Sequence, residues 1–489
     1  MKKALLVYLL MSAPFLLFAQ STRMMYWYFG QNAGIDFTSG QPVVVTDGQL
    51  KAWENSTSIS DLNGDLLFYT NGRTVWNRNH DTLENGFMLF GDESALKGSL
   101  VVPLPGSQHA YHLLTTTGAF RYHTIDMNLD NGLGAVVLKN QEVLPHTTES
   151  LAGTLHCNKT DYWIVTRSWN PEDVFLNDTM HFYVSLLDSN GLSTPVRQTF
   201  HLDTRYKTLY DHPTFSPSGK LFSYSSLSSN VYLFDFDTYT GALAFKDSIR
   251  FNTVDSDSLV EKVYSTEFSP DETKLYVTYW KKMIGWTYIA QFDLTAPDIT
   301  ASKVILDSIP IPPGIQYAWG TLGRIQLAPD GKIYASRYRS VGQYFVRDTL
   351  DAILYPNQSG LAATYQRDFL PLNGKPATCG LPGFISNFSQ EDIGQPDCPS
   401  VADVNVLPSI SFSVFPNPVE SGCTVQLIGN NNKACRVFLS DLSGRIHLKE
   451  TTNEAGSAYL NTKELASGMY TVVVEYEGQI QRTGKLIVQ

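Results

Sequence analysis

Short runs of apolar residues, separated by turn residues, follow one another along most of the chain. The clearest runs lie at 66–69, 162–165 and 275–280, and they are apolar at nearly every consecutive position. A strand covered on one face alternates apolar and polar residues, whereas a continuous apolar run needs cover on both faces. The pattern therefore predicts β-strands that are buried on both faces. Amphipathic helical periodicity of any length is absent from the sequence.

One strand–turn–strand motif recurs along the chain. At 215–224, the sequence FSPSGKLFSY puts Pro217 where a turn needs a φ near its fixed value and Gly219 where a turn needs a positive φ. In a looser copy, Asn63-Gly64 is the preferred pair for a two-residue turn with two positive φ values. The related copies lie at 60–69, 268–277 and 327–334.

Strand-rich units recur at a spacing of roughly 40 to 60 residues, which is the repeat length of four-stranded propeller blades. A final unit at 379–385 lacks outer strands of its own. We expect the N-terminal strands at 27–37 to pair with strands around Phe384, because such closure removes the exposed edges of a linear array. The sequence thus predicts an all-β protein with a seven-bladed β-propeller at 21–388. Six and eight blades are the alternatives.

The chain changes character after the predicted propeller. Residues 389–408 are polar and aperiodic, and they contain several proline and glycine residues, so they are predicted to form a linker. Short β-prone runs, divided by glycine- and asparagine-rich turns, fill the remaining residues. Short strands at that density predict a small antiparallel β-sandwich at 409–489.

The first residues have the three parts of a secretory signal peptide. Lys2 and Lys3 form a positive n-region, residues 4–18 form an apolar h-region, and Ala19 is a small-residue cleavage site. A membrane anchor is the alternative, but the apolar run is short and is interrupted by a serine and a proline. We expect a signal peptide at 1–19 and no transmembrane segment in the mature chain.

Charge and composition exclude one class of partner. The formal net charge is −11 among 489 residues, and the mature chain has a single adjacent basic pair, Lys281-Lys282. Binding to nucleic acid requires clustered lysine and arginine side chains that neutralise phosphates. No nucleic-acid partner is therefore predicted.

The five cysteines are predicted to have structural roles. An exported protein can form disulfides, and the pairs that are close in sequence are Cys379 with Cys398 and Cys423 with Cys435. An odd number leaves at least one thiol free. A zinc site is disfavoured because the sequence has no Cys-x-x-Cys spacing.

Several motifs near the end of the chain occur in a fixed order. They are Phe-Pro-Asn-Pro at 415–418, Asp-Leu-Ser-Gly-Arg at 441–445, Leu-Ala-Ser-Gly-Met-Tyr at 465–470 and Lys-Leu-Ile-Val at 485–488. Together they resemble the type A C-terminal sorting domain of type IX secretion cargo of the Bacteroidota. The resemblance implies an immunoglobulin-like sandwich that the outer-membrane secretion machinery recognises and that is then usually removed, the passenger becoming attached to a surface glycolipid. The N-terminal motifs at 27–30, 59–61 and 75–79 resemble propeller-type surface proteins of the same bacteria.

The resemblance also implies a set of sorting residues. In addition to this role, Gly468 is expected to serve a turn that a Cβ-bearing residue would fit less easily, and Tyr470 begins a long β-prone run. The implied sorting-signal residues are Pro416, Asn417, Pro418, Gly468, Tyr470 and Lys485.

Candidate metal and catalytic motifs are incomplete. Asp61, Asn63 and Asp65 have the spacing that starts a calcium loop, but Leu66 and Gly72 stand where glycine and glutamate are needed, so a solvated turn is predicted instead. The histidines of the first half have no metal-ligand spacing, and the Gly-x-Ser-x-Gly and His-Glu-x-x-His motifs do not occur. No catalytic residue, cofactor or metal site is predicted.

Aromatic residues give generic support for binding. Segments with Trp76, Trp169, Trp286 and Trp319 can present rings to sugars or to proteins, although most aromatic residues are expected to fill the space between blades. We therefore predict a secreted or cell-surface protein that binds a glycan or a protein. A propeller hydrolase or lyase acting on extracellular polysaccharide is the alternative. Convergent charged groups at the channel mouth would support the enzyme, and an aromatic, charge-poor mouth would support binding.

Overall fold

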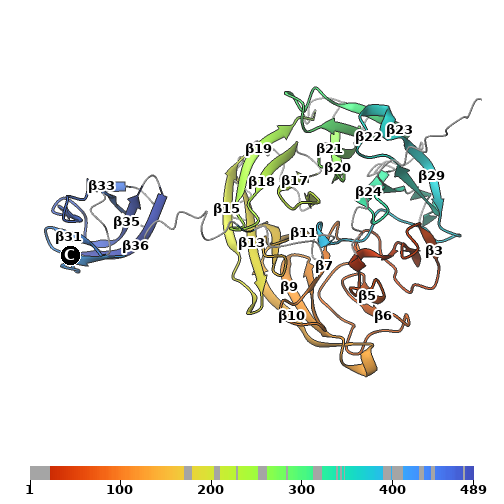
Figure 1. The fold of residues 1–489 in the computed structure, drawn as a ribbon, viewed down its shortest axis with the longest axis horizontal. Coiled ribbons are helices and arrows are strands. Elements are labelled where there is room, and N and C mark those ends of the chain that lie inside the picture. The colour runs from red at the N-terminus through yellow and green to blue at the C-terminus, as the bar shows by residue number, and fades with distance from the viewer. Residues whose placement is uncertain are drawn as a thin grey trace, which may run out of the picture. The chain divides into compact units, whose positions relative to one another are not determined.

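The computed structural model divides the chain into two compact units, Met1–Cys398 and Pro399–Gln489 (Figure 1). The predicted signal peptide and most of the predicted linker lie outside the described residues. The described residues are 22–169, 179–202, 210–226, 230–251, 261–281, 285–311, 322–337, 340–341, 344–345, 347–388, 398, 411–428, 434–441, 446–476 and 479–489.

Antiparallel sheets follow one another along the first unit. The first three contain β1 (Tyr26–Phe29), β2 (Ala33–Asp36) and β3 (Val43–Val45); β4 (Thr57–Ser60), β5 (Leu66–Thr70) and β6 (Val75–Asn77); and β7 (Ser99–Pro103), β8 (Ala110–Thr116), β9 (Ala119–Asp126) and β10 (Ala135–Pro145). The next contains β11 (Thr147–Leu155), β12 (Tyr162–Ser168), β13 (Thr179–Asp188), β14 (Gly191–Leu192) and β15 (Val196–His201).

The remaining sheets of this unit have the same antiparallel order. They contain β16 (Asp211–Phe215), β17 (Leu221–Ser226), β18 (Val231–Phe236) and β19 (Leu243–Ile249); β20 (Glu261–Phe268), β21 (Lys274–Lys281), β22 (Trp286–Asp293) and β23 (Val304–Pro310); and β24 (Leu322–Leu327), β25 (Ile333–Arg337), β28 (Thr349–Ile353) and β29 (Tyr365–Pro371). A separate two-stranded sheet contains β26 (Ser340–Val341) and β27 (Tyr344–Phe345).

The sheets of the first unit form a propeller-like ring. In Figure 1 they follow one another around a centre in chain order, with β7, β11, β20 and β24 on the inside and β3, β10, β19, β23 and β29 at the rim. The first strands of consecutive sheets contact each other, in the order β1, β4, β7, β11, β16, β20 and β24. We call these seven strands the inner strands. The all-β, propeller-like prediction is confirmed.

The apolar runs are buried as the pattern predicts. Every residue of β5 and β12 is buried, and β21 is buried except at Lys281. The recurrent turn is also confirmed at its best copy, since Gly219 has a φ of 75° and its N–H donates to the carbonyl of Ser216 at 2.8 Å. Glycine therefore supplies the left-handed conformation that closes this turn.

The turn at Asn63-Gly64 differs from the prediction. Gly64 has a φ of 90°, but Asn63 is not among the residues with positive φ. The carboxylate of Asp61 instead accepts the N–H groups of Asn63 at 2.8 Å and Asp65 at 2.9 Å, which holds a longer turn. The two-residue turn with two positive φ values is wrong. The same carboxylate contacts agree with a turn, rather than a calcium loop, at these residues.

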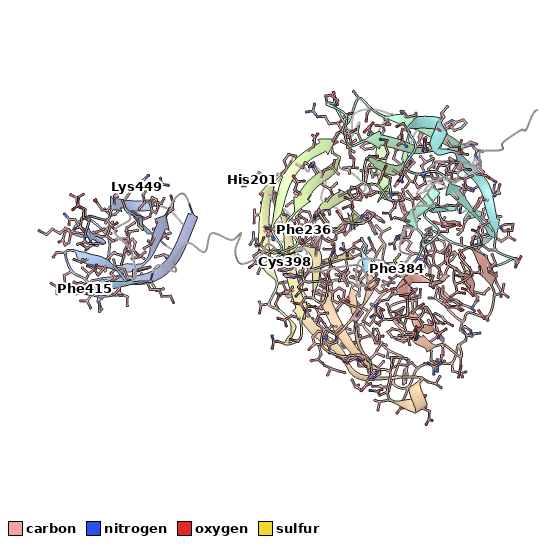
Figure 2. The ribbon with its side chains drawn as sticks, in the orientation of Figure 1. His201, Phe236, Phe384, Cys398, Phe415 and Lys449 are labelled. Atoms are coloured by element: carbon pink, nitrogen blue, oxygen red, sulfur yellow. A yellow bond between two sulfur atoms is a disulfide. The ribbon has the colours of Figure 1, made fainter. Side chains whose placement is uncertain are left out.

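The predicted pairing of 27–37 with strands around Phe384 is also wrong. β1 pairs with β2, β2 pairs with β3, and residues 376–388 contain no strand. Phe384 instead lies inside the ring unit, with its ring centroid 6.0 Å from that of Trp27 (Figure 2). The N-terminal strands therefore have a sheet of their own and meet the end of the ring through side chains.

Residues 376–388 form an irregular segment that crosses the inner strands, and we call it the strap. Backbone hydrogen bonds join Cys379 N–H to Trp53 C=O at 3.0 Å and Gly383 N–H to Ser56 C=O at 2.8 Å. Arg324, on β24, donates to the Leu381 carbonyl at 2.8 Å. Further along, Leu155 N–H donates to the Asn387 side chain at 2.7 Å. The strap thus connects the β24, β4 and β11 sheets through the interior of the ring.

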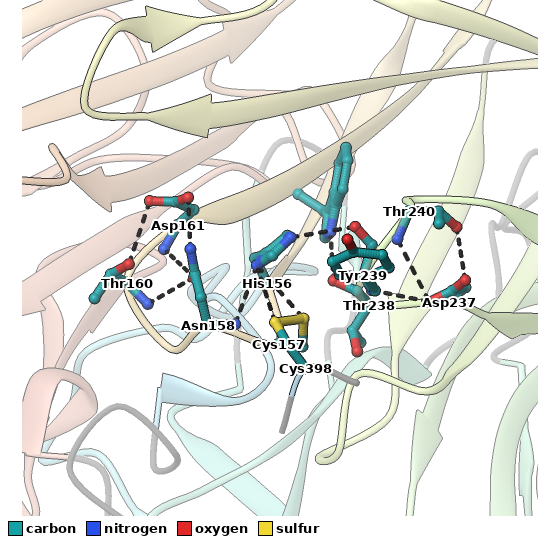
Figure 3. Close-up of a disulfide and its surroundings, with 11 residues drawn as sticks. His156, Cys157, Asn158, Thr160, Asp161, Asp237, Thr238, Tyr239, Thr240 and Cys398 are labelled. Atoms are coloured by element: carbon teal, nitrogen blue, oxygen red, sulfur yellow. Dashed lines mark hydrogen bonds between the residues drawn. A yellow bond between two sulfur atoms is a disulfide. The ribbon is translucent and has the colours of Figure 1, made fainter. Parts of the chain in front are cut away.

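A disulfide fixes the chain beyond the strap. Cys157 and Cys398 are bonded, whereas Cys379, Cys423 and Cys435 are free (Figure 3). The two predicted pairings of sequence neighbours are therefore wrong, because folding brings Cys398 to the turn between β11 and β12. The predicted free thiol is confirmed.

The second unit consists of two sheets that share one core. One sheet contains β30 (Ser411–Phe415), β31 (Cys423–Ile428) and β34 (Ser457–Leu460), and the other contains β33 (Ile446–Thr451), β32 (Arg436–Ser440), β35 (Gly468–Tyr476) and β36 (Gln479–Val488). Buried residues of both sheets, among them Val425, Leu439, Val472 and Leu486, pack together. The predicted antiparallel strands are present.

Helical structure is short in the described residues. It comprises the 3₁₀ turns η1 (Thr22–Met24), η2 (Asp130–Gly132) and η3 (Gly360–Ala363). Within the described part of the chain, a helix with the length and apolar character to span a membrane is not found.

Candidate functional site

The predicted sorting residues come together on the second unit. Asn417 links two of the motifs, because its side chain donates to the Lys485 carbonyl at 2.8 Å and accepts the Ile487 N–H at 2.9 Å. Val419 extends this contact with a backbone hydrogen bond of 2.8 Å to the Ile487 carbonyl. The third motif joins through β35, where Met469 lies opposite Ile487. Motifs that are separated by up to 70 residues therefore form one surface.

Side chains on this surface are exposed although several are apolar. Phe415 is 52% exposed, Met469 is 42% exposed and Ile487 is 47% exposed, and Pro416, Asn417, Pro418, Gly468 and Lys485 are exposed as well. We call these eight residues the terminal surface, of which Phe415 is labelled in Figure 2. Exposed apolar residues that gather in one place are typical of interaction sites.

Two of the predicted sorting residues have different structural roles. Tyr470 is buried in the core of the second unit, and its hydroxyl donates to the Ala466 carbonyl at 2.9 Å. Gly468 starts β35 without a positive φ, and a Cβ placed there would have no neighbouring atom closer than 4.0 Å. The expected turn requirement at Gly468 is therefore wrong. Core packing explains the tyrosine at position 470, but the structure does not explain the glycine at position 468.

A second group of candidate side chains lies near the beginnings of four inner strands. Glu54 precedes β4, Asp92 precedes β7, Glu149 is on β11 and Asp211 starts β16. We call these four residues the axial carboxyl cluster. Asn55 donates to the Asp92 carbonyl at 2.9 Å, which joins the first two segments.

Hydrogen bonds also join the later members of the cluster. The backbone N–H of Leu151 donates to the Lys97 carbonyl at 3.0 Å, and the Ser150 hydroxyl donates to the Asp211 carbonyl at 2.5 Å. The Glu149 carboxylate accepts a hydrogen bond from the backbone of Leu96. These contacts hold four strand starts from consecutive sheets side by side.

The cluster extends across the ring. The hydroxyl of Tyr264, on β20, donates to Glu54. The β20 and β4 sheets are not neighbours in the ring, so this bond brings together side chains from opposite sides of its axis. Tyr210, which is 37% exposed, is close enough to Glu149 and Glu54 for their charges to act on its phenol. Two carboxyls and two phenols from different sheets therefore lie near one another.

Burial changes the protonation of these carboxyls. It raises the pKa of Glu54 to about 7, with smaller upward contributions from Glu149 and Asp92, and the Tyr264 hydrogen bond acts in the opposite direction. Burial also raises the pKa of Glu149 to about 7, and the charges of Asp211 and Asp92 add to this effect. Such carboxyls exchange protons near neutral pH, which is a common property of functional sites.

Asp211 has an unusual environment. Burial raises its pKa to about 6 even though Arg167 lies 3.9 Å away. Hydrogen bonds with the side chains of Thr148, Ser150 and Tyr224 act together with Arg167 to lower this pKa. The guanidinium of Arg167 donates to the Tyr224 hydroxyl. Burial outweighs these partners, and Asp211 is part of a buried network with Arg167 and Tyr224.

A further charged group is separate from the axial cluster. Lys97, Glu267 and Arg324 are buried and act on one another, and burial lowers the pKa of Lys97 to about 7. The Lys97 ammonium donates to the Pro213 carbonyl at 2.9 Å. Arg324 also donates to the Leu381 carbonyl of the strap, so this group contributes to the packing of the ring interior.

The one set of potential metal ligands that gathers closely in the described residues is His156, Cys157 and Cys398. The two sulfurs form the disulfide, and His156 Nδ1 accepts the Asn158 N–H at 3.0 Å (Figure 3). Its Nε2 lies 3.2 Å from the Tyr239 carbonyl. The set is therefore a cross-link with its supporting hydrogen bonds.

The aromatic residues expected to present rings are mostly internal. Trp280 and Tyr279 are buried, and Trp76 stacks on Tyr69 with 5.6 Å between ring centroids. Trp286 is exposed, whereas Trp319 lies outside the described residues. The expectation that most of the aromatic residues fill the protein interior agrees with these positions.

The axial carboxyl cluster was not predicted from the sequence. Its members lie on different sheets, and no spacing along the chain connects them. A weak signal does exist: Glu54 lies three residues before β4, Glu149 is the third residue of β11 and Asp211 is the first residue of β16. Aligning the repeat units on their first strands would have drawn attention to these acidic residues.

Comparisons with known proteins identify part of the chain. Residues 413–489 match a family model described as a secretion system C-terminal sorting domain. No curated protein matches the chain.

Three solved structures illustrate the similarity of this chain to other proteins. A protein from Lactobacillus plantarum is 14% identical with a TM-score of 0.42, covering 73% of this chain and 99% of its own. A putative 6-phosphogluconolactonase from Bacteroides fragilis is 10% identical with a TM-score of 0.42, covering 73% and 97%. The β-propeller domain of Cps50 (Swd1) from Myceliophteria thermophila is 11% identical with a TM-score of 0.31, covering 80% and 96%.

Proposed function

On the premise that this chain is a cargo of the type IX secretion system, exported to the outer surface or secreted, we propose that it binds a glycan or a protein outside the cell. The proposed organisation is a signal peptide at 1–19, a seven-bladed propeller at 21–388, a linker at 389–408 and an immunoglobulin-like sorting sandwich at 409–489. Seven inner strands that contact one another in chain order support the blade number.

The terminal surface is the proposed contact for the secretion machinery. The observations in its favour are that Asn417 links two motifs, that the third pairs with them through β35, and that Phe415, Met469 and Ile487 are exposed. Pro416, Asn417, Pro418, Gly468 and Lys485 form the signal in this proposal. Tyr470 supports it from the core of the unit.

Gly468→Ala tests the sorting role without disturbing the fold. A methyl group has space at this position, so the melting temperature of the full chain should not change. In the native host, the amount of protein on the cell surface should fall and the periplasmic amount should rise. Normal surface levels in this variant would remove Gly468 from the signal. Ala455→Gly, at an exposed position of the same unit outside the sorting motifs, is the control.

Ligand binding by the ring rests on one observation. Glu54, Glu149, Tyr210 and Tyr264 converge at the axis from different sheets, and they combine hydrogen-bonding groups with aromatic rings. Sites of this composition recognise polar ligands. A glycan array and a protein pull-down with the full chain test the proposal. Loss of the captured ligand in Glu149→Gln, and its retention in Glu84→Gln, are the expected results.

An enzyme is the second candidate, because the axial site contains convergent carboxyls rather than a charge-poor mouth. Two carboxyl groups that titrate near pH 7 can act as proton donor and acceptor, as hydrolases and lyases of polysaccharides require. Turnover of an extracellular polysaccharide that is abolished by Glu54→Gln would establish this function over simple binding. Binding without turnover would exclude it for the ligands tested.

A further inference from the structure

Charged and aromatic side chains gather on one face of the strands β20, β21 and β22, which are labelled in Figure 1. Glu261 lies opposite Lys281, and Lys281 lies opposite Trp286, so these three residues form a row across the strands. Tyr279 and Tyr288 lie opposite each other in the adjacent row. Directly opposed residues, and residues two apart on one strand, point to the same face of a sheet. The five side chains therefore share one face.

Two lysines on this face share one carboxylate oxygen. The Nζ atom of Lys281 lies 3.2 Å from Glu261 Oε1, and that of Lys303 lies 3.5 Å from the same oxygen. An ammonium group has several N–H donors, so this contact uses at most one donor of each lysine. The lysine side chains are 28% and 25% exposed, so an anion in solution can reach them. The three groups together have an excess of positive charge.

Aromatic rings hold the two ammonium groups in place. Lys303 Nζ lies 4.2 Å from the ring centroid of Tyr279, and Lys281 Nζ lies 5.5 Å from that of Tyr288. The two tyrosine rings are stacked, with 5.1 Å between their centroids. The face of an aromatic ring attracts a cation. The lysines are therefore positioned before a ligand arrives, which lowers the entropic cost of binding.

The hydroxyl of Tyr279 is independent evidence that this group is incomplete. Tyr279 is 1% exposed, and its hydroxyl has no hydrogen-bond partner within the described part of the chain. Burial and then the charge of Glu261 raise the pKa of this phenol, so the hydroxyl lies on the side of the shared carboxylate. A buried polar group without a partner is costly and uncommon in native proteins. An acceptor supplied by a ligand would complete it.

Trp286 adds an apolar surface next to the lysines. It is 37% exposed and lies directly opposite Lys281 on the neighbouring strand. An indole ring has a large flat face that packs against C–H groups. A ligand that fits this place has an apolar ring face and, at its edge, a negatively charged group. We call Lys303 and the five residues of the two rows the Trp286 face.

We propose that the Trp286 face binds an acidic sugar, whose ring packs against Trp286 and whose carboxylate accepts hydrogen bonds from Lys281 and Lys303. The Tyr279 hydroxyl is the additional donor beside the bound carboxylate. Charge-assisted hydrogen bonds of this kind are the stronger ones, so they provide the discrimination against neutral sugars. The proposal rests on the proposed glycan binding and gives the glycan a chemical class and a place on the ring.

Three small probes test this chemistry on the full chain. Sodium D-glucuronate has both the sugar ring and the carboxylate, D-glucose has the ring alone, and sodium acetate has the carboxylate alone. At saturating concentration and matched ionic strength, D-glucuronate should raise the melting temperature by about 2 °C or more, and the other two probes should leave it unchanged. Calorimetric titration then measures the affinity directly.

Matched variants assign the binding to this face. Lys281→Met keeps the apolar stem but removes the ammonium group, and it should weaken D-glucuronate binding about tenfold. Trp286→Ala removes the apolar surface and should have a similar effect. Lys246→Met is the control, because Lys246 also pairs with one carboxylate, that of Asp235 at 2.7 Å, but on the β16–β19 sheet. Melting of the unliganded variants shows that they are folded.

Glu261→Gln should have the opposite effect on affinity. The Glu261 carboxylate competes with the ligand for the two lysines, so its removal should tighten D-glucuronate binding. A residue that only supported the fold would weaken binding or leave it unchanged when substituted. Either of those results in a folded variant would contradict the proposed arrangement.

Other outcomes also overturn the proposal. Equal stabilisation by acetate would make this a simple anion site, and equal stabilisation by D-glucose would remove the role of the lysines. Binding that survives both Lys281→Met and Trp286→Ala, or no binding of D-glucuronate at any concentration, would remove the Trp286 face as a sugar site. A neutral glycan or a protein that is still captured by the Lys281→Met chain would leave the proposed function standing while this inference fails.

Discussion

Single residues decide the pH behaviour of the ring. In Glu54, burial holds the pKa at about 7 in the folded protein, against 4.5 for an ordinary glutamate. The folded state therefore keeps a proton that the unfolded state loses between these two values. The contribution of Glu54 to stability is full below pH 4.5 and is lost as the pH rises through 7.

Glu54→Gln should remove this pH dependence. At pH 8 we expect the variant to be more stable than the wild type by about 1–2 kcal/mol, because it has no charge to bury. At pH 4 the two proteins should be equally stable. Thermal melts across this range measure the difference, with Glu84→Gln as the exposed control. A variant that is less stable than the wild type at pH 8 would contradict the assignment.

Asn417 has a comparable role in the second unit. Asn417→Ala removes two hydrogen bonds to β36, and it should destabilise this unit by about 1–2 kcal/mol. Calorimetry of the full chain should show a lower melting temperature for the second unit and no change for the ring. Asn461→Ala is the control, since the Asn461 side chain accepts a single local N–H, from Lys463. Equal effects of the two substitutions would argue against a special role for Asn417.

Local sequence signals predicted residues whose conformation is set by their neighbours. Pro217 and Gly219 specify their turn by steric limits that do not depend on the rest of the protein. At Asn63 the same reasoning failed, because the side chain of Asp61 accepts hydrogen bonds from two backbone N–H groups and thereby stabilises a different turn. Competition from a side-chain acceptor is difficult to rank from sequence alone.

At the scale of elements, strands were predictable and the strap was not. The strands β5 and β12 were predictable from their continuous apolar runs, because a strand buried on both faces needs apolar residues on both faces. The strap has no periodicity, and its backbone bonds to residues more than 200 positions away, such as Gly153 and Ser56. The axial carboxyl cluster escaped prediction for the same reason, because each member comes from a different sheet.

Two glycines of the strap provide a graded test of its packing. A Cβ on Gly380 would lie 1.8 Å from the carbonyl oxygen of Glu54, whereas one on Gly383 would lie 3.0 Å from that of Ser99. Gly380→Ala should therefore destabilise the ring by about 3 kcal/mol or more, and Gly383→Ala should cost about 1 kcal/mol. Urea unfolding gives both values. The reverse order would show that the strap is not held as described.

The whole molecule depends on a link that joins distant parts of the chain. The disulfide between Cys157 and Cys398 encloses a segment with a sequence separation of 241 residues. Replacing both cysteines by alanine should cost the ring about 2–5 kcal/mol, mainly through the greater freedom of the unfolded chain. The double-alanine variant and the reduced wild-type protein should have the same melting temperature. Unchanged stability would show that the strap alone keeps the ring closed.

The two units should also be separable. Residues 21–400 keep the disulfide and the strap, so this fragment should melt at the temperature of the ring in the full chain. In the native host it should remain in the periplasm because it lacks the sorting domain. Surface display of this fragment at normal levels would contradict the sorting role of residues 413–489.

The position of Cys398 has a mechanical consequence. A surface protein attached through residues that follow the ring is pulled at that end whenever its ligand or the surrounding flow exerts force. Here such a load would reach the covalent bond to Cys157 before it reached the hydrogen bonds of the strap. The ring would then bear tension through the turn between β11 and β12, and shear on the cell surface would not peel its last segment away.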